Sequence, residues 1–304
     1  MEFYDYKRIP KEYWKLRDWI PNDKVRWYEL SSNPAAIHML EAYPSNIDWN
    51  KLSSNPAAIH LLEANPNKIN WVNLSINPNS AAIYLLEKNL DKVDWCWLSE
   101  NPAAIRLLEA NQSKINWEML SFNSAAIYLL EANPNKINWN CLSLNSSAIH
   151  LLEANPSIIY WKNLSFNSAA IHLLEKNPLK VFWFGLSFNP AAISLLEANP
   201  LKIEWFALSL NPAAIALLEA NPSEIYWHNL SSNPAIFTYD YQYIKETRQQ
   251  LNKEIIQESI AKIYHPAKLF KSSLAESTDI DKEIDDYVEI FEPKCLQSSQ
   301  SEKV

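Results

Sequence analysis

Glycine is almost absent from this chain of 304 residues, in which Gly185 is the only one. Loops that cradle phosphate groups, dinucleotide-binding fingerprints and nucleophile elbows all need several glycines close together in sequence. This fact of composition excludes the commonest classes of nucleotide-binding enzyme.

Cysteine and long apolar runs are scarce as well. The three cysteines, Cys96, Cys141 and Cys295, lie far apart and form no paired pattern, so we interpret them as reduced thiols of an intracellular protein. No uninterrupted apolar run approaches the roughly 20 residues that span a bilayer. The opening stretch, MEFYDYKRIPKEYWKL, is charged and aromatic rather than apolar, so we expect no signal peptide.

Positive charge is the third feature in short supply. The chain has 27 basic against 35 acidic residues and a formal net charge of -8. Nucleic-acid-binding proteins need an excess of Lys and Arg to neutralise phosphates. We therefore expect neither nucleic acid nor a membrane as a partner, and no pattern calls for a cofactor.

Most of the chain consists of one repeated unit, for example WNKLSSNPAAIHLLEANPNKIN at residues 49–70. Its tryptophan recurs at positions 27, 49, 71, 95, 117, 139, 161, 183, 205 and 227, so the spacing is 22 in eight of the nine cases and 24 in the other. The longer interval holds two extra residues at Asn77-Pro78-Asn79-Ser80, which we expect to bulge without breaking the array. A fixed period of this length is typical of proteins whose units stack on their neighbours.

Each unit predicts two short helical elements. In the stretch Asn-Pro-Ala-Ala-Ile-x-Leu-Leu-Glu-Ala-Asn, Asn55 is a good N-cap, Pro56 suits the first helical position, and Asn65 is expected to provide a left-handed exit. The second half, Lys-Ile-x-Trp-x-x-Leu-Ser, is long enough for a 3₁₀ turn or a single α turn, capped by Asn70 or its equivalent. Helices this short are unstable alone, so stability must come from packing between units.

These elements predict an all-α fold, an α-solenoid of about nine to ten repeats that forms a curved rod. At roughly 9–10 Å per repeat the rod would be about 80–100 Å long. We expect an N-terminal cap over residues 1–26, the repeats over residues 27–236, a helical C-terminal cap over residues 237–296 and a flexible tail over residues 297–304. The C-terminal cap should begin with an amphipathic helix over residues 239–264 and continue in two shorter helices after His265-Pro266.

The unit LSSNPAAIHLLEANPNKINW at residues 52–71 resembles the Asn-Pro repeats of proteins that giant DNA viruses of amoebae and algae encode in many copies. The closing segment, with Asn233-Pro234-Ala235-Ile236-Phe237 and later His265-Pro266-Ala267-Lys268-Leu269, is also similar to that family. A looser similarity is to leucine-rich variant repeats, which alternate an α-helix with a 3₁₀ turn. The resemblance covers residues 15–270 and implies a viral protein without an agreed activity.

Two sets of polar residues, one of glutamates and one of histidines, recur along the repeats and are candidates for an acid/base or metal site. Glu41 recurs as Glu63, Glu87, Glu109, Glu131, Glu153, Glu175, Glu197 and Glu219. Successive rungs about 9–10 Å apart cannot share one cation, so we favour a ladder that is solvated or salt-bridged, and the natural partners are Lys68, Lys92, Lys114, Lys136, Lys180 and Lys202. His38, His60, His150 and His172 occupy a slot that varies between repeats, which does not favour a metal site. His228 and His265 have no carboxylate or Cys close in sequence.

The recurrent Trp should form a buried aromatic spine.

One trend is not explained by the period. Slots around the Trp turn are polar early in the array, as in Asp48 and Asn138, and become apolar later. The late residues, our predicted partner-binding residues, are Tyr160, Phe166, Phe182, Phe184, Phe188, Phe206 and Tyr226, joined by Leu179 and Leu201 in the connecting segments. A large exposed apolar patch usually marks a partner. The alternatives are that the C-terminal helices cover the patch or that these slots point inward.

The sequence therefore predicts a non-enzymatic scaffold for protein–protein interaction, acting in the host cytoplasm or virus factory. The partner is a host or viral protein, and self-association is left open. The alternative is a structural or linker component of a virion or capsid.

Overall fold

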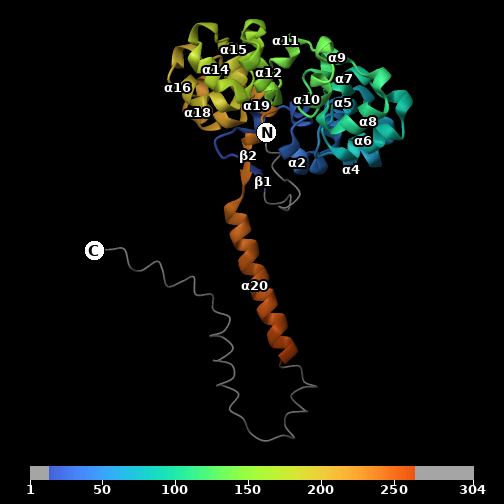
Figure 1. Ribbon diagram of the computed structural model, residues 1–304. Coiled ribbons are helices and arrows are strands. Elements are labelled where there is room, and N and C mark those ends of the chain that lie inside the picture. Colours follow the sequence, from blue (N-terminus) through green and yellow to red (C-terminus); the bar gives the residue numbers. More distant parts are fainter. Residues whose placement is uncertain (1–13, 264–304) are drawn as a thin grey trace, which may run out of the picture. The chain divides into compact units, whose positions relative to one another are not determined.

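The computed structural model describes residues 14–263, which fold as a series of short helices (Figure 1). The predicted all-α repeat solenoid is confirmed. The chain divides into two compact units, residues 1–241 and 242–304. Residues 1–13 of the predicted N-terminal cap, the helices predicted after His265 and the predicted tail lie outside the described residues.

Every repeat contributes a helix that starts at its tryptophan. These Trp helices are α1 (Trp27–Leu30), α3 (Trp49–Ser53), α5 (Trp71–Ser75), α7 (Trp95–Glu100), α9 (Trp117–Leu120), α11 (Trp139–Leu142), α13 (Trp161–Leu164), α15 (Trp183–Phe188), α17 (Trp205–Leu208) and α19 (Trp227–Ser231). The second helices of the repeats are α2 (Ile37–Ala42), α4 (Ile59–Ala64), α6 (Ser80–Glu87), α8 (Ile105–Ala110), α10 (Ile127–Glu131), α12 (Ile149–Ala154), α14 (Ile171–Lys176), α16 (Ile193–Glu197) and α18 (Ile215–Ala220).

Short 3₁₀ turns join these helices. Those at the Asn-Pro positions are Pro34–Ala36, Pro102–Ala104, Ser146–Ala148, Ser168–Ala170, Pro190–Ala192, Pro212–Ala214 and Pro234–Ile236. Those before the Trp helices are Asn22–Lys24, Pro44–Asn46, Pro66–Lys68, Leu90–Lys92, Gln112–Lys114, Pro134–Lys136, Pro156–Ile158, Pro178–Lys180, Pro200–Lys202 and Pro222–Glu224. The second unit contains a longer helix, α20 (Tyr241–Ile263), as the sequence predicts.

The Asn-Pro corner forms much as the sequence predicts. The Asn55 side chain accepts a hydrogen bond from the Ala57 amide at 3.0 Å, although the turn it caps is tighter than the expected α-helix. The left-handed exit expected at Asn65 is wrong, because its φ is -134°. Asn65 Nδ2 instead donates to the Leu61 carbonyl at 2.9 Å. The side chain thus provides a hydrogen bond to a carbonyl of the last turn, where helix carbonyls lack a backbone N–H partner.

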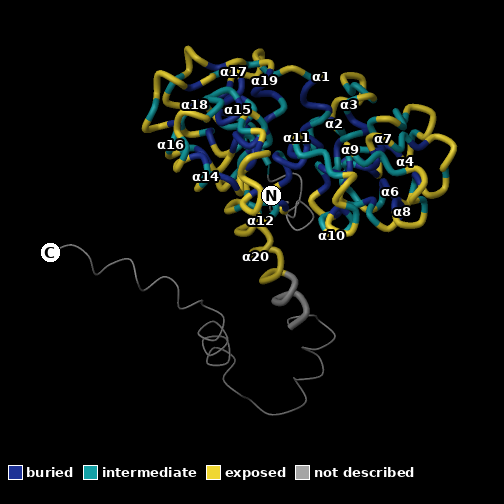
Figure 2. Tube along the Cα trace, turned by 45° about the horizontal axis from the view of Figure 1, so that its top comes forward, coloured by how far each residue is buried: buried dark blue, intermediate teal, exposed yellow. Residues whose placement is uncertain are grey.

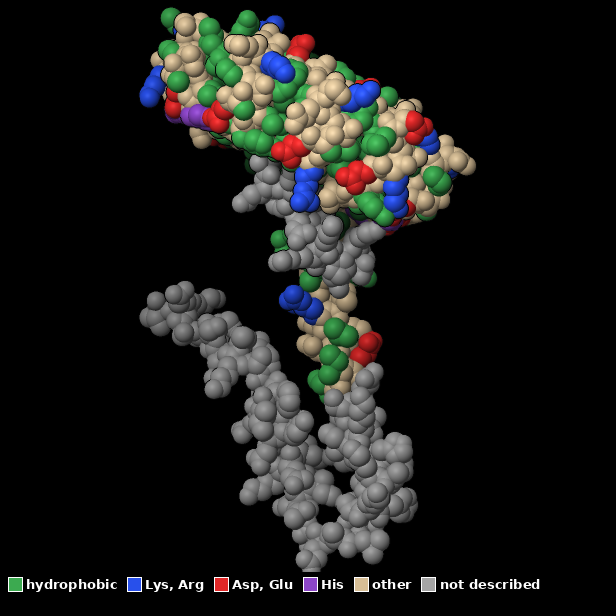
Figure 3. All heavy atoms as spheres, turned by 45° about the vertical axis from the view of Figure 1, so that its right-hand side comes forward, with side chains coloured by type: hydrophobic (Ala, Val, Ile, Leu, Met, Phe, Trp, Pro, Cys, Tyr) green, Lys and Arg blue, Asp and Glu red, His purple; other side chains and the backbone are tan. Residues whose placement is uncertain are grey.

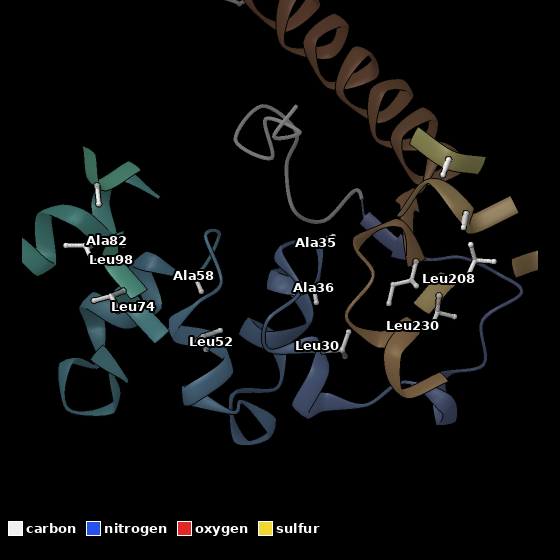
Figure 4. Close-up of a cluster of buried hydrophobic side chains, with 14 of the residues drawn as sticks. Leu30, Ala35, Ala36, Leu52, Ala58, Leu74, Ala82, Leu98, Leu208 and Leu230 are labelled. Atoms are coloured by element: carbon white, nitrogen blue, oxygen red, sulfur yellow. The ribbon is translucent and has the colours of Figure 1, made fainter. Parts of the chain in front are cut away.

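The core runs along the array as stacked leucine and alanine side chains. Leu52 and Leu62, with Ala58 between them, are completely buried, and the first nine repeats all supply equivalents. In Figure 2 buried segments lie between exposed connecting turns. In Figure 4 Leu30 of the first repeat lies between Leu52 of the second and Leu230 of the tenth, which shows that the two ends of the array meet.

A ladder of buried asparagines connects all ten repeats and closes on itself. The side-chain amide of Asn55 donates to the carbonyls of Ser31 and Asn33 in the preceding repeat. The other rungs are Asn77, Asn101, Asn123, Asn145, Asn167, Asn189, Asn211 and Asn233, with bonds of 2.9–3.1 Å. Asn33 then donates to the carbonyls of Ser231 and Asn233 in the last repeat, each at 3.1 Å. The array is therefore a closed ring, and the predicted curved rod is wrong.

The tenth repeat is built from both ends of the chain. Its Trp helix and Asn-Pro turn end at Ile236, and residues 20–26 supply the connecting segment that leads to Trp27. The Arg26 amide donates to Ser231 Oγ at 3.0 Å, as the Asn70 amide donates to Ser53 Oγ at 2.9 Å between earlier elements of the array. Residues 20–26 thus complete a repeat, where the sequence suggested a cap on an open end.

Two short strands fasten this closure and were not predicted. β1 (Trp14–Leu16) pairs antiparallel with β2 (Phe237–Tyr239), with Leu16 opposite Phe237. Beside them, the Arg17 amide and Nε donate to the carbonyls of Ile236 and Ala235, at 2.9 and 2.7 Å. We call the two strands the clasp. The insertion at Asn79 leaves the ring intact, because Asn77 keeps both of its ladder bonds.

Closure can be tested with a pair of matched asparagines. Asn145→Ala leaves two buried carbonyls without their donor, and each such loss costs about 1–3 kcal/mol, so we expect the free energy of unfolding to fall by about 2–4 kcal/mol. Asn33→Ala should cost as much, because Asn33 makes the same bonds across the seam. Urea denaturation measures both. A small loss for Asn33→Ala beside a large loss for Asn145→Ala would contradict a closed ring.

The clasp should also loosen in acid. His38 lies edge-on against Phe237, with ring centroids 5.2 Å apart, and burial lowers its pKa from 6.5, opposed by a backbone hydrogen bond at Ala35 and by Glu41. Because the folded-state pKa lies below the unfolded value, the unfolded chain binds the proton first as pH falls. Stability should be intact above about pH 6.5 and decline below it until the folded-state pKa is reached.

His38→Gln removes this proton-linked loss, so its urea midpoint should change less between pH 7 and pH 5 than that of the parent chain. Ser194→Gln, in the same slot of another repeat and away from the clasp, changes no group that titrates between pH 7 and pH 5 and is the control, so it should keep the parental slope. Equal slopes for His38→Gln and the parent would contradict the role given to His38.

Candidate partner-binding surface

The residue before each tryptophan is the N-cap of the Trp helix, and its identity changes along the ring. Before the second Trp helix, Asp48 accepts a hydrogen bond from the Lys51 amide at 2.8 Å. Equivalent side-chain caps are made by Asn70, Asp94, Asn116 and Asn138. Tyr160, Phe182, Glu204 and Tyr226 occupy this position later, and no side-chain cap forms there. A cap contributes about 1 kcal/mol, so the aromatic residues weaken the helices that they precede.

Six of the seven predicted partner-binding residues form one continuous chain of rings. The ring centroids of Phe166 and Phe188 are 5.6 Å apart, and those of Phe184 and Phe188 are 5.3 Å apart. Phe184 continues to Phe206 at 6.4 Å in a stacked arrangement. The remaining contacts are Phe166–Phe182 at 6.4 Å, Phe182–Phe184 at 5.8 Å and Phe206–Tyr226 at 5.5 Å. We call these six residues the aromatic cluster.

The single glycine of the chain lies under this cluster. A Cβ added to Gly185 would lie 2.7 Å from Cε2 of Phe166 and 3.2 Å from Cδ1 of Phe182, and the first distance is shorter than real contacts of that kind. The equivalent position in the next repeat is Ala207, which is buried. Gly185 therefore gives the Phe166 ring room to lie against the backbone of α15. The sequence shows that this glycine is isolated, but it gives no sign of this role.

The cluster is anchored at one end and exposed at the other. Phe166, Phe182, Phe184 and Phe188 are half-buried, whereas Phe206 and Tyr226 are 46% and 51% exposed. Leu179 and Leu201, in the connecting turns of the same repeats, are each 100% exposed. The suggestion that these slots point inward is therefore wrong for the exposed members. Cover by the C-terminal helices involves the second compact unit and stays a prediction.

Tyr160 is exposed but stands apart from the cluster. It lines a cavity of about 270 Å³ together with Trp139, Ser157, Ile158 and Ile159. The sequence grouped Tyr160 with the phenylalanines, and the structure gives it these different neighbours. Elsewhere the ring surface is mixed: on the face shown in Figure 3, acidic and basic side chains are interspersed with hydrophobic ones.

The predicted Glu–Lys salt bridges are replaced by other pairs. Glu41 lies 2.7 Å from His60 Nε2 of the next repeat, and Glu131–His150, Glu153–His172 and Glu109–Tyr128 repeat this pairing. Five of the six lysines, all except Lys114, lie over tryptophan rings of their own repeats instead. The pairs are Lys68–Trp49, Lys92–Trp71, Lys136–Trp117, Lys180–Trp161 and Lys202–Trp183, with Nζ 4.1–4.8 Å from the ring centroid. The tryptophans are half-buried rather than a buried spine.

The seam of the ring holds a separate polar cluster. The buried carboxylate of Glu29 accepts from Ser232 Oγ at 2.8 Å, and its other oxygen lies 2.9 Å from His228 Nε2. Lys51 Nζ is 3.6 Å from Glu29. His228 thus has a carboxylate partner that the sequence did not reveal, because Glu29 lies at the other end of the array. His265 lies outside the described residues.

The remaining candidates for chemistry are few. Within residues 14–263, no three His, Cys, Asp or Glu side chains lie together as a metal site would need. Cys96 and Cys141 are free thiols, and burial raises the pKa of Cys141 to about 11, which disfavours the reactive thiolate. Cys295 is outside the described range. Of the helices in the described part of the chain, none combines the length and the apolar character that a bilayer span requires.

One protein-family model matches the chain, over residues 19–183, and its description is periplasmic copper-binding protein, NosD. The match covers more than half of the 304 residues, so by sequence the chain belongs to the NosD family as that model defines it. The matched stretch contains the first seven Trp helices and the turns and helices between them. Neither the curated proteins nor the solved structures contain a match to the chain.

The contact between Gly185 and Phe166 can be tested with a double-mutant cycle. Replacing Gly by Ala in a helix normally stabilises it by about 0.5–1 kcal/mol, but Gly185→Ala must displace the Phe166 ring, and such overpacking costs about 1–3 kcal/mol. We expect net destabilisation in urea denaturation. In the Phe166→Ala background the clash is gone, so the same change should become neutral or stabilising. The same sign in both backgrounds would contradict the packing described.

Proposed function

We propose that the ring is a non-enzymatic scaffold that binds a protein partner through the aromatic cluster together with Leu179 and Leu201. The observation that carries the proposal is the exposure of large apolar side chains on consecutive late repeats. Phe206 and Tyr226 are about half exposed, and the two leucines are fully exposed. A contiguous apolar area of this kind usually marks a binding surface.

The loss of helix caps supports the proposal. Tyr160, Phe182 and Tyr226 stand where earlier repeats carry an Asp or Asn cap, and each lost cap costs about 1 kcal/mol. Phe182 and Tyr226 offset part of this cost through contacts with neighbouring rings, whereas Tyr160 is 50% exposed. An energetic cost repeated in several late repeats is typical of residues selected for binding rather than for folding.

The closed ring suits such a role. Its ten repeats are joined by the buried asparagine ladder, so the cluster stands on a framework that is fixed before a partner arrives. Binding to a preorganised surface avoids the entropy of ordering it. Aromatic side chains add large contact areas with few rotatable bonds, and they are enriched at binding hot spots. The viral setting belongs to the proposal through the sequence resemblance alone.

The proposal can be tested by quantitative affinity capture with the full chain as bait. The double variant Phe206→Ser, Leu201→Ser removes exposed apolar area without altering the core. A true partner should be enriched by the parent chain and lost, by about tenfold or more, with this variant, because each buried aromatic or leucine anchor contributes about 1–2 kcal/mol.

Val72→Ser is the matched control. Val72 occupies the slot of Phe206 in the third repeat and is 45% exposed, against 46% for Phe206. It should capture the same proteins as the parent chain, and circular dichroism should show equal helix content in all variants. If every protein enriched by the parent chain is also enriched by the double variant, the aromatic cluster is not the interface.

A further inference from the structure

The lysine–tryptophan ladder is interrupted in the sixth repeat, and a cavity lies at that place. In five repeats the lysine of the connecting turn lies over the tryptophan ring, with Nζ 4.1–4.8 Å from the ring centroid. In the sixth repeat the equivalent residue is Ile158, which has no charge. The cavity of about 270 Å³ is lined by Trp139, Ile158 and Tyr160.

Two other repeats also lack this lysine, and each replaces it differently. Asn46 stands there in the first repeat, where Trp27 packs against Tyr43 with ring centroids 5.4 Å apart. Glu224 stands there in the ninth repeat and carries the opposite charge. The sixth repeat differs from both, because its replacement is apolar and borders a cavity.

A second departure from the repeat pattern helps to shape this cavity. Tyr160 stands where the preceding repeat has the capping residue Asn138, and its helix has no side-chain cap. Two substitutions in one repeat, lysine by isoleucine and cap by tyrosine, thus remove an internal cation and add a second aromatic wall. Both lie in the segment 157–160 that lines the cavity.

The chemistry of the lining favours an elongated cation. A positive charge is attracted to the face of an indole or phenol ring, and the net charge of -8 raises the local concentration of cations. Ser157 adds a hydroxyl that can accept a hydrogen bond, and Ile158 adds apolar surface for an alkyl stem. A lysine side chain combines these features, since it buries its methylene stem along apolar surface and keeps its ammonium at the edge.

We propose that this cavity binds the side chain of a lysine that belongs to the protein partner. The ammonium of that lysine lies over the Trp139 ring, where other repeats place a lysine of their own. The inference rests on the proposed function for the existence of the partner. It adds a charged anchor point to an interface that is otherwise aromatic and aliphatic. An ion over an aromatic face also depends on direction, so this contact would fix the orientation of the partner on the ring.

The first test needs no partner and uses a lysine probe, Nα-acetyl-lysine methylamide, with its uncharged analogue Nα-acetyl-norleucine methylamide. The indole N–H resonance of Trp139, assigned from its absence in Trp139→Phe, is followed by NMR during titration at constant ionic strength. The lysine probe should shift this resonance and the norleucine probe should shift it much less. Equal shifts would mean a purely apolar pocket, and no shift with either probe would mean no site; both overturn the proposal.

Ile158→Lys supplies the decisive variant, because it restores the residue that most other repeats carry at this position and so keeps the fold. The ammonium of the introduced lysine should lie over the Trp139 ring and abolish the shift caused by the lysine probe. Ile158→Leu should leave that shift unchanged. In affinity capture, Ile158→Lys should bind the partner about fivefold less, the size of one cation–π contact at a partly exposed site. A partner captured equally by Ile158→Lys and the parent chain overturns the inference.

The two proposals fail in different ways. Loss of the partner with Phe206→Ser, Leu201→Ser but full retention with Ile158→Lys removes only the lysine site. Retention of every captured protein with the first variant removes the proposed interface itself, whatever the probe shows.

Discussion

The buried asparagine of each repeat is the constraint on which the structure depends. Its side chain caps its own Asn-Pro turn through Oδ1 and donates through Nδ2 to two carbonyls of the preceding repeat, as Asn55 does to Ser31 and Asn33. All of these groups are shielded from water, so a missing bond would leave a costly unpaired carbonyl. The ladder therefore fixes the rotation from one repeat to the next, and after ten repeats the bonds of Asn33 close the circle.

Closure changes what the ends of the chain have to do. Open solenoids need polar terminal repeats because no neighbour covers their outer faces. Here the first repeat covers the last, and residues 20–26 with the tenth Trp helix form one shared unit. The clasp adds strand pairing and the Arg17 bonds at the junction. Stability that an open array would lose at its ends is kept, which allows some repeats to carry residues that do not favour folding.

The sequence predicted the features that depend on neighbours along the chain. The period, the capping by Asn55 and the two helices per repeat were correct, because each follows from residues within one unit. Closure was missed since it depends on small rotations that add up over ten units. One clue was present: residues 24–26 resemble the end of a unit without a beginning, and Asn233-Pro234 begins a unit without an end. The Glu–Lys pairing failed because the chain turns between them and brings Lys68 and four of its equivalents back to the tryptophan of their own repeat.

The candidate site also combines features that the sequence reveals with features that depend on the folded arrangement. The aromatic trend was legible in the sequence, and the fold brings six of its residues into one chain of rings, namely Phe166, Phe182, Phe184, Phe188, Phe206 and Tyr226. The room made by Gly185 and the cavity beside Trp139 needed the fold, since they depend on distances between side chains. A ring of ten identical units would keep every cap and every lysine rung. The departures at Ile158, Tyr160 and Phe182 give up such contacts in adjacent repeats. Phe182 gains ring contacts with Phe166 and Phe184 in exchange, whereas Ile158 and Tyr160 line the cavity beside Trp139, and it is there that the proposed contact with another molecule offers a reason for the change.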